Sequence, residues 1–144
     1  ETARVLRGGW LHTGDRGMMD EQGILYFLGR MKDVIRKKGE NVSAVEVEAV
    51  LLSHPSVADA AVIGVETSDS VGEDEIQACV VWGPECSQDW EVLISYCTHN
   101  LAGFKVPRLW QAWNELPKNS MNRVVKSRLK ELSPEAGEVY DRGR

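Results

Sequence analysis

The order of short strand patterns and one clear helix pattern decides which folds this chain can adopt. Residues 57–65 and 76–82 are strand candidates, and apolar and polar side chains alternate in the second of them. From residue 87 to about residue 101 the apolar residues recur at helical spacing, which predicts the clearest helix of the chain. Short strands with local connections favour a compact α+β fold: a small sheet of mainly antiparallel strands flanked by helices, not a doubly wound parallel sheet.

The N-terminal third combines a predicted hairpin with a basic segment. Residues 9–28 are expected to form a hairpin. Apolar and polar residues are mixed through residues 10–13, a turn is expected at 20–23, and the apolar residues 24–28 would form the returning strand. Residues 29–42 carry a run of lysines and arginines and are expected to form an irregular connector.

Residues after the connector predict further elements. Ser43 and Glu46 have the spacing of a capping box, which predicts a short helix. This helix should end before Pro55, because proline disfavours helical geometry in the residue before it. The remaining expectations are a strand over 109–113, a short helix over 126–132 and a frayed polar tail over 133–144.

Composition limits the classes of function. A length of 144 residues is enough for about one domain with its own core. The formal net charge of -5 argues against a general affinity for nucleic acid or an anionic membrane, so the basic segment needs a local explanation. No apolar run is long enough to predict a membrane span. The spacing of the three cysteines fits neither a disulfide framework nor a zinc site, which indicates free thiols in a reducing cytoplasm and no metal site.

Two charged residues suggest nucleotide chemistry. Asp15 follows a glycine, a common setting for a turn aspartate, and Arg30 opens the basic segment. A carboxylate can bind the hydroxyls of a ribose, and a guanidinium can bind phosphate. No glycine-rich phosphate loop follows any predicted strand, so most of a phosphate site would lie outside this chain.

Three ordered motifs resemble the adenylate-forming enzymes, which include acyl-CoA and aryl-CoA synthetases, peptide-synthetase adenylation domains and firefly-type luciferases. The sequence WLHTGD at 10–15 is similar to the Thr-Gly-Asp motif of that family. Residues 29–48 are similar to its Gly-Arg-x-Lys/Asp-Asp hinge and the Gly-Glu-Asn loop that follows. The third motif is FKVP at 104–107 with ELPK at 115–118, and the whole resemblance covers about residues 9–129.

The resemblance implies a domain organisation. Members of the family have a large N-terminal domain and a mobile C-terminal lid. By this likeness residues 1–29 would end the large domain, 30–132 would form the lid and 133–144 the tail. The chain, which begins at Glu1 without methionine, would then be an inactive fragment whose partner is its own N-terminal domain, with an oligomer left open.

The resemblance also implies an activity. The family uses ATP to convert a carboxylic acid to an acyl-adenylate, and after the lid rotates a thiol, usually that of coenzyme A, takes the acyl group. The Gly-Glu-Asn sequence at 39–41 is typical of the acyl-CoA and aryl-CoA branches. The chain is therefore expected to belong to a cytoplasmic carboxylate:CoA ligase of fatty acid metabolism, with ATP, Mg²⁺ held by the missing domain, and coenzyme A.

Four positions receive roles from the resemblance. Asp15 would bind the ribose of the adenylate, and Arg30 would contact ribose or phosphate. Lys32 would be the hinge residue of the rotating lid. Gly39 would line the channel for the pantetheine arm, because a residue without a side chain lets the arm pass close to the backbone. The neighbouring lysines 37 and 38 are expected to be solvated, or at most to lie near phosphates of coenzyme A.

One position departs from the family pattern. Where the family usually has a Gly-Lys pair whose lysine enters the active site, this chain has Asn122-Arg123. Arg123 could perform the lysine's task in a reshaped site, Lys118 or Lys126 could supply the charge through a shifted loop, or adenylation could be weak while thioester formation survives. We favour the first interpretation.

Other notable residues are expected to be structural. Cys97 lies on the apolar stripe of the predicted helix, and Trp110 and Trp113 fit strand packing better than a ligand cage. Glu46 is interpreted as a helix cap, and His12, His54 and His99 are assigned no chemistry. Two alternative functions remain: a lid-like interaction or regulatory module without catalysis, and an adenylation domain of another branch.

Overall fold

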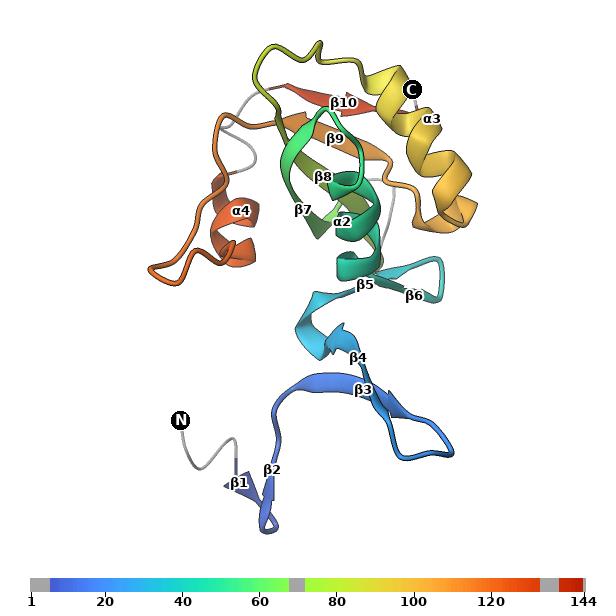
Figure 1. Ribbon diagram of the computed structural model, residues 1–144, viewed down its shortest axis with the longest axis vertical. Helices are drawn as coiled ribbons and strands as arrows, with labels where there is room; N and C mark the ends of the chain where they lie inside the picture. Colours follow the sequence, from blue (N-terminus) through green and yellow to red (C-terminus); the bar gives the residue numbers. More distant parts are fainter. Residues whose placement is uncertain (1–5, 68–71, 133–137, 144) are drawn as a thin grey trace.

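The computed structural model describes residues 6–67, 72–132 and 138–143. A four-stranded sheet lies at its centre in the order β10-β9-β8-β7 (Figure 1). The strands are β7 (Val57–Glu66), β8 (Asp74–Trp82), β9 (Leu109–Ala112) and β10 (Val139–Asp141). Neighbouring strands of this sheet are antiparallel, except for β8 and β9, which are parallel. The predicted α+β fold class with a mainly antiparallel sheet is therefore confirmed.

Three helices cover the sheet from two sides. Helix α2 (Ala44–Leu52) and helix α3 (Trp90–Asn100) pack on one face, and α4 (Lys126–Leu132) packs on the other (Figure 1). The helix α3 lies in the crossover that the parallel β8–β9 pair requires. A short 3-10 turn, η2 (Gly103–Lys105), follows it. These helices and the strands over 57–66, 74–82 and 109–112 match the sequence predictions to within a few residues.

Both faces of the β7–β8 pair are buried. Ala60 and Val62 belong to the core under α2 and α3, whereas Ala61 and Ile63 belong to the smaller core under α4. Successive side chains of a strand point to opposite faces, so adjacent residues of β7 enter different cores. This two-sided burial explains why residues 60–65 of β7 carry no polar side chain.

Aromatic and thiol side chains pack inside the two cores. Trp110 is fully buried, and its ring centroid lies 6.1 Å from that of Trp90. Its indole nitrogen donates to the Pro107 carbonyl at 3.1 Å, so its polar edge is satisfied. Burial raises the pKa of the Cys97 thiol to about 11 and that of Cys79 to about 12, so both thiols stay protonated at neutral pH. Their function is packing, which confirms the interpretation of Cys97.

The N-terminal part contains two short antiparallel pairs, β1 (Leu6–Arg7) with β2 (Trp10–Leu11) and β3 (Asp15–Met19) with β4 (Leu25–Arg30). The predicted turn is present: the Asp20 carboxylate accepts the amides of Gln22 and Ile24, the latter being the main cause of its lowered pKa. The outgoing strand differs from the prediction. Trp10 pairs with Arg7, and the strand that meets β4 begins only at Asp15.

The prediction of an irregular connector over residues 29–42 is wrong. After a single 3-10 turn, η1 (Met31–Asp33), the strands β5 (Val34–Lys37) and β6 (Glu40–Ser43) form a hairpin. Its turn residues Lys38 and Gly39 have φ angles of 50° and 78°, the left-handed pair that matches the twist of a two-residue hairpin. Ile35 and Val42 face each other across the hairpin and are buried in the larger core, which holds it in place.

The prediction of a frayed tail is wrong for the strand β10. Its residues pair with β9, and Arg108 binds both carboxylate oxygens of Asp141 at 2.9 Å. Residues 133–137 and 144, also part of the predicted tail, lie outside the described residues. A bidentate ion pair between distant parts of the chain is invisible to local sequence patterns.

The capping-box prediction is correct in position but wrong in mechanism. Ser43 is the N-cap residue of α2, yet its side chain makes no capping hydrogen bond. Glu46 does not reach back to the helix start, because its two oxygens bind Nζ of Lys105 at 2.6 and 2.8 Å. This ion pair ties the start of α2 to the segment before β9.

Candidate functional site

The two residues predicted to bind nucleotide lie together. Asp15 and Arg30 are directly paired across β3 and β4, and Arg30 Nε lies 3.2 Å from Asp15 Oδ1. Gly14, with φ of 74°, turns the chain so that its carbonyl accepts the Met31 amide at 2.8 Å. Thr13 Oγ1 accepts the Asp15 amide at 3.1 Å. The short polar turn and the strand pairing thus place a carboxylate beside a guanidinium.

This pair is accessible to a ligand. The Arg30 side chain is 60% exposed and that of Asp15 is 34% exposed. An ion pair in such a setting contributes roughly 0–1 kcal/mol, so a ligand can open it at little cost. A carboxylate that accepts two hydroxyls beside a planar donor is suited to a ribose that carries phosphate.

The predicted hinge residue lies at a boundary in the structure. Lys32 is the middle residue of η1, the single turn between β4 and β5. Figure 1 shows the β3–β4 hairpin standing away from the body that the central sheet and its helices form, with this turn between them. Isolated 3-10 turns are common as connectors between elements. The position agrees with a pivot, and the role remains a prediction.

The predicted channel residue, Gly39, occupies a tightly held turn. Glu73 accepts the Lys38 amide at 2.8 Å with one carboxylate oxygen and the Gly39 amide at 3.0 Å with the other. A Cβ placed on Gly39 would meet no atom within 4 Å, so the fold needs glycine here for its positive φ and not for space. The open space leaves room for a ligand beside the backbone.

The prediction that Lys37, the residue before this turn, is solvated is wrong. Lys37 was expected to be solvated, but it is buried, and its Nζ lies 3.0 Å from Glu75 Oε2. A buried ammonium is tolerated because a carboxylate matches its charge. The ion pair fixes β5 against β8.

The loop that carries Arg123 is compact. Asn119 Oδ1 accepts the amides of Met121 and Arg123 at 3.0 and 2.9 Å, and the Asn119 amide donates to the Arg123 carbonyl. Asn122 adopts φ of 60°, a conformation that asparagine tolerates well. The Arg123 side chain is exposed and forms no ion pair with any residue that the structure describes.

Both alternative lysines are engaged elsewhere. Lys118 Nζ lies 2.7 Å from Asp59 Oδ2, and Lys126 Nζ lies 2.8 Å from Glu48 Oε1. Glu48 also accepts the Val62 amide at 2.7 Å, which connects α2, β7 and the start of α4. Moving either lysine into an active site would break an ion pair within the domain. Among the described residues, Arg123 is therefore the candidate cation that no ion pair of the domain holds.

The structure brings together some of the predicted residues only. Asp15 and Arg30 form one cluster, whereas, among the described residues, neither Gly39 nor Arg123 forms a hydrogen bond or an ion pair with either of them. Glu73 and Glu75, which hold the Gly39 hairpin, were missed by the sequence analysis. Their partners lie far away along the chain, so no local spacing signals the contact.

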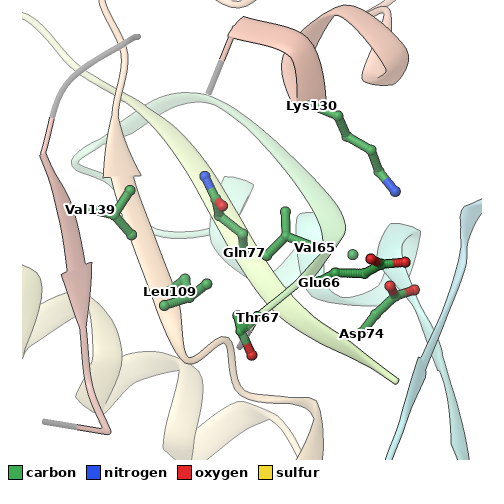
Figure 2. A pocket seen from close by; sticks show the side chains of 9 residues that line it. Val65, Glu66, Thr67, Asp74, Gln77, Leu109, Lys130 and Val139 are labelled. Carbon is green, nitrogen blue, oxygen red and sulfur yellow. The ribbon is translucent and has the colours of Figure 1, made fainter. Parts of the chain in front are cut away.

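A separate hollow of about 650 Å³ contains none of the predicted site residues. Figure 2 shows it between the β7–β8 hairpin, β9, β10 and α4, with Lys130 extending toward the carboxylates of Glu66 and Asp74. Among the described residues, no group of three His, Cys, Asp or Glu side chains could hold a metal ion. No helix in the same part of the chain is long and apolar enough to cross a membrane.

Residues 46–122 match the AMP-binding enzyme C-terminal domain, and the chain belongs to this family. The match begins in α2 and ends in the loop before Arg123. It includes the central β7–β8–β9 sheet and helix α3.

Similar proteins extend the likeness toward both ends of the chain. Crotonobetaine/carnitine–CoA ligase of Citrobacter koseri is 40% identical over 130 residues, which are 90% of this chain and 25% of that protein. The chain thus spans about a quarter of the length of such relatives. Because the alignment covers 130 of 144 residues, it necessarily includes residues 15–130, and with them every predicted site residue.

Solved structures agree in fold. The o-succinylbenzoate CoA synthetase (MenE) of Bacillus subtilis, in complex with the acyl-adenylate intermediate, superposes with a TM-score of 0.79 at 38% identity, covering 89% of this chain and 26% of that one. The amide bond synthetase McbA of Marinactinospora thermotolerans gives 0.78 at 36% identity, covering 92% and 26%. The same MenE synthetase was also solved with AMP, and with ATP and a magnesium ion.

The carboxylate of Glu73 provides a test of how the Gly39 turn is held. In Glu73→Ala both turn amides lose a charged acceptor, a type of hydrogen bond worth about 1.5–3 kcal/mol. We expect hydrogen exchange at the Lys38 and Gly39 amides, followed by NMR, to accelerate about tenfold or more. The control is Glu66→Ala, which removes an exposed carboxylate from the β7–β8 hairpin, to which Glu73 also belongs. It should leave both exchange rates unchanged. Unaltered exchange in Glu73→Ala would show that the turn does not depend on this carboxylate.

Proposed function

We propose that this chain is the C-terminal part of an ATP-dependent carboxylate:CoA ligase, which forms an acyl-adenylate and then an acyl-CoA thioester. The observation that carries the proposal is the likeness to a CoA ligase over a stretch that includes all the predicted site residues. The domain family and the solved acyl-adenylate complex of a CoA synthetase support it. Residues 1–29 would end the large domain, and 30–132 would be the lid, extended by β10.

The exposed apolar surface of the N-terminal hairpin supports a missing domain as partner. Large apolar side chains on β3, on β4 and in the turn between them are 45–72% exposed: Met18, Met19, Ile24, Leu25, Tyr26 and Phe27. Contiguous exposure of this kind usually marks an interface. We infer that the preceding, larger part of the same protein covers this face, since the relatives are about four times longer than this chain.

The residues of this chain would serve two half-reactions. Asp15 and Arg30 fit the ribose and phosphate of the adenylate, because their paired charges are exposed and easily opened. Arg123 would stabilise the charge that develops on the carboxylate and the α-phosphate during adenylation. The Gly39 turn would border the path of the thiol during thioester formation. Mg²⁺ and most of the ATP phosphates would be held by the missing domain.

The cellular location and the substrate class are inferred from the thiols and from a similar solved structure. Free thiols at Cys79, Cys86 and Cys97 agree with a reducing cytoplasm. A fatty acyl CoA synthetase of Mycobacterium tuberculosis is 34% identical, with a TM-score of 0.69, which supports a role in fatty acid metabolism. Choice of the acid would reside in the missing domain, so an assay of this protein needs several classes of acid.

Pyrophosphate exchange by the full-length protein tests the proposed activity. With ATP and Mg²⁺ we expect exchange that depends on one class of acid in a panel of fatty, aryl and zwitterionic carboxylic acids. Addition of coenzyme A should then yield the acyl-CoA. The isolated 144-residue chain should show no exchange. Absence of exchange with every acid would favour the alternative of a lid-like module without catalysis.

Arg123 should matter for one half-reaction only. In the full-length protein, Arg123→Ala removes a preorganised charge at the adenylation site and should slow acyl-adenylate formation by about a hundredfold. Thioester formation from preformed acyl-adenylate should change less than threefold by the same reasoning. Arg123→Lys should recover part of the rate, and Lys130→Ala, which removes an exposed cation of α4, should have no effect. Equal adenylation rates in Arg123→Ala and the parent would exclude Arg123 from the mechanism.

A second candidate function differs in the molecule that accepts the acyl group. The likeness to an amide bond synthetase, at 36% identity and a TM-score of 0.78, favours an amine as the nucleophile. Both candidates share acid-dependent pyrophosphate exchange. They separate when the acyl-adenylate is offered coenzyme A or an amine, because only the preferred acceptor will be acylated rapidly.

A further inference from the structure

The loop that carries Arg123 is a short hairpin. Its two legs meet in a bridge between Lys118 and Val124, and the Val125 amide donates to the Pro117 carbonyl at 2.8 Å. Together with the hydrogen bonds at its tip, these contacts give the loop a defined shape of its own. Because all of them lie within the loop, they do not fix where the loop stands on the domain.

Two ion pairs attach the legs of this hairpin to the rest of the domain. On the first leg, Lys118 Nζ lies 2.7 Å from Oδ2 of Asp59, a residue of β7. The second leg leads into α4, whose first residue Lys126 has its Nζ 2.8 Å from Oε1 of Glu48, a residue of α2. Arg123 stands between the two attachment points along the chain. The two carboxylates therefore determine where the hairpin presents its arginine.

Both ion pairs are partly withdrawn from water. The side chains of Lys118 and Asp59 are 30% and 27% exposed, and those of Lys126 and Glu48 are 23% and 17% exposed. The ammonium nitrogen of Lys126 is itself buried, and within the described part of the chain no aligned hydrogen bond reaches it. The carboxylate of Glu48 therefore matches it by charge. Because a buried charge without a partner is costly, loss of the carboxylate charge would force this leg to move.

The two carboxylates are held in place by the central strand β7. Glu48 accepts the Val62 amide at 2.7 Å through the same oxygen that faces the lysine. Asp59 accepts the Ala60 amide at 2.9 Å through Oδ1, which leaves Oδ2 for the other lysine. Val62 and Ala60 are both buried in the larger core. The attachment points of the hairpin thus share the rigidity of a close-packed interior.

We propose that Asp59 and Glu48 are positioning residues for the adenylation half-reaction. Through their ion pairs with the two lysines they hold the hairpin so that Arg123 meets the charge that develops on the reacting groups. The inference rests on the proposed function, in which Arg123 acts in that half-reaction. Neither carboxylate touches substrate. A cation that is already in place stabilises a transition state without reorganisation at the moment of reaction, and this placement is what the two ion pairs supply.

Variants of the full-length protein that remove each charge but keep the side-chain shape test the proposal. Asp59→Asn and Glu48→Gln retain an oxygen for the amides of Ala60 and Val62. We expect each to slow acyl-adenylate formation about tenfold, because a misplaced reacting group loses much of its effect. Thioester formation from preformed acyl-adenylate should change less than about threefold by the same reasoning. Glu66→Gln, which removes an exposed charge of β7, should alter neither rate. Adenylation at the parent's rate in both Asp59→Asn and Glu48→Gln would overturn the proposal.

A double-variant cycle separates positioning from a general structural role. If Asp59 acts through Arg123, Asp59→Asn should slow adenylation about tenfold in the parent but less than about twofold in an Arg123→Ala background. Lys118→Met combined with Asp59→Asn should cost no more than either change alone, because both break the same ion pair. Equal effects of Asp59→Asn in the parent and in the Arg123→Ala background would show that Asp59 only supports the domain, and would overturn its assignment.

Hydrogen exchange separates this inference from the proposed function, because it needs no turnover. In the full-length protein, exchange in peptides that cover residues 117–125 is followed by mass spectrometry. Both charge-removing variants should accelerate it about tenfold, while peptides of α3 should be unchanged. Unchanged exchange at the hairpin in both variants would overturn the inference even if the ligase is active. A parent that adenylates no acid, with a hairpin loosened by both variants, would contradict the proposed function and the adenylation role while the two attachments stand.

Discussion

The burial of the β7–β8 pair on both faces is the constraint on which the rest of the structure depends. Adjacent residues such as Val62 and Ile63 enter different cores, so a slip of one residue would exchange the two sets of side chains and fill neither core. The helices α2 and α3 cover one face and α4 covers the other. Every loop of the candidate site, from the Gly39 turn to the loop with Arg123, begins or ends at an element that packs on this pair or extends its sheet.

Carboxylates connect those loops to the sheet and its helices. Glu73, the residue before β8, holds the Gly39 turn, and Glu75 of β8 holds Lys37. Glu48 of α2 holds Lys126, and Asp59 of β7 holds Lys118, which leaves Arg123 as the exposed cation between them. Partly buried charge pairs add modest stability, yet they specify which loop meets which strand. The proposed division between an adenylating face and a thiol face follows from where these pairs place Arg123 and Gly39.

The sequence predicted the elements whose signals are local. The stripe through Leu93 and Cys97 identified α3, and the alternation over 76–82 identified β8, because each pattern reflects burial on the element itself. The β5–β6 hairpin and β10 were missed because Lys37 and Asp141 look solvated until their distant partners are known. For the site, the motifs indicated Asp15 and Arg30, which the fold does pair, whereas the support from Glu73 depends on a tertiary contact that no spacing reveals.

We propose that the lid serves two half-reactions of the full-length protein by turning about η1. Proline at Lys32 would fix φ and remove an amide near the start of η1, where helix amides generally lack intrahelical partners. In the full-length protein with Lys32→Pro, acyl-adenylate formation and thioester formation from preformed adenylate are measured separately. The account predicts that one half-reaction keeps its rate within a few-fold while the other falls by about a hundredfold or more, as expected when a gating motion is blocked. If both rates are unchanged, or both fall equally in a protein with the parent's unfolding midpoint, the claim of a rotating lid is contradicted.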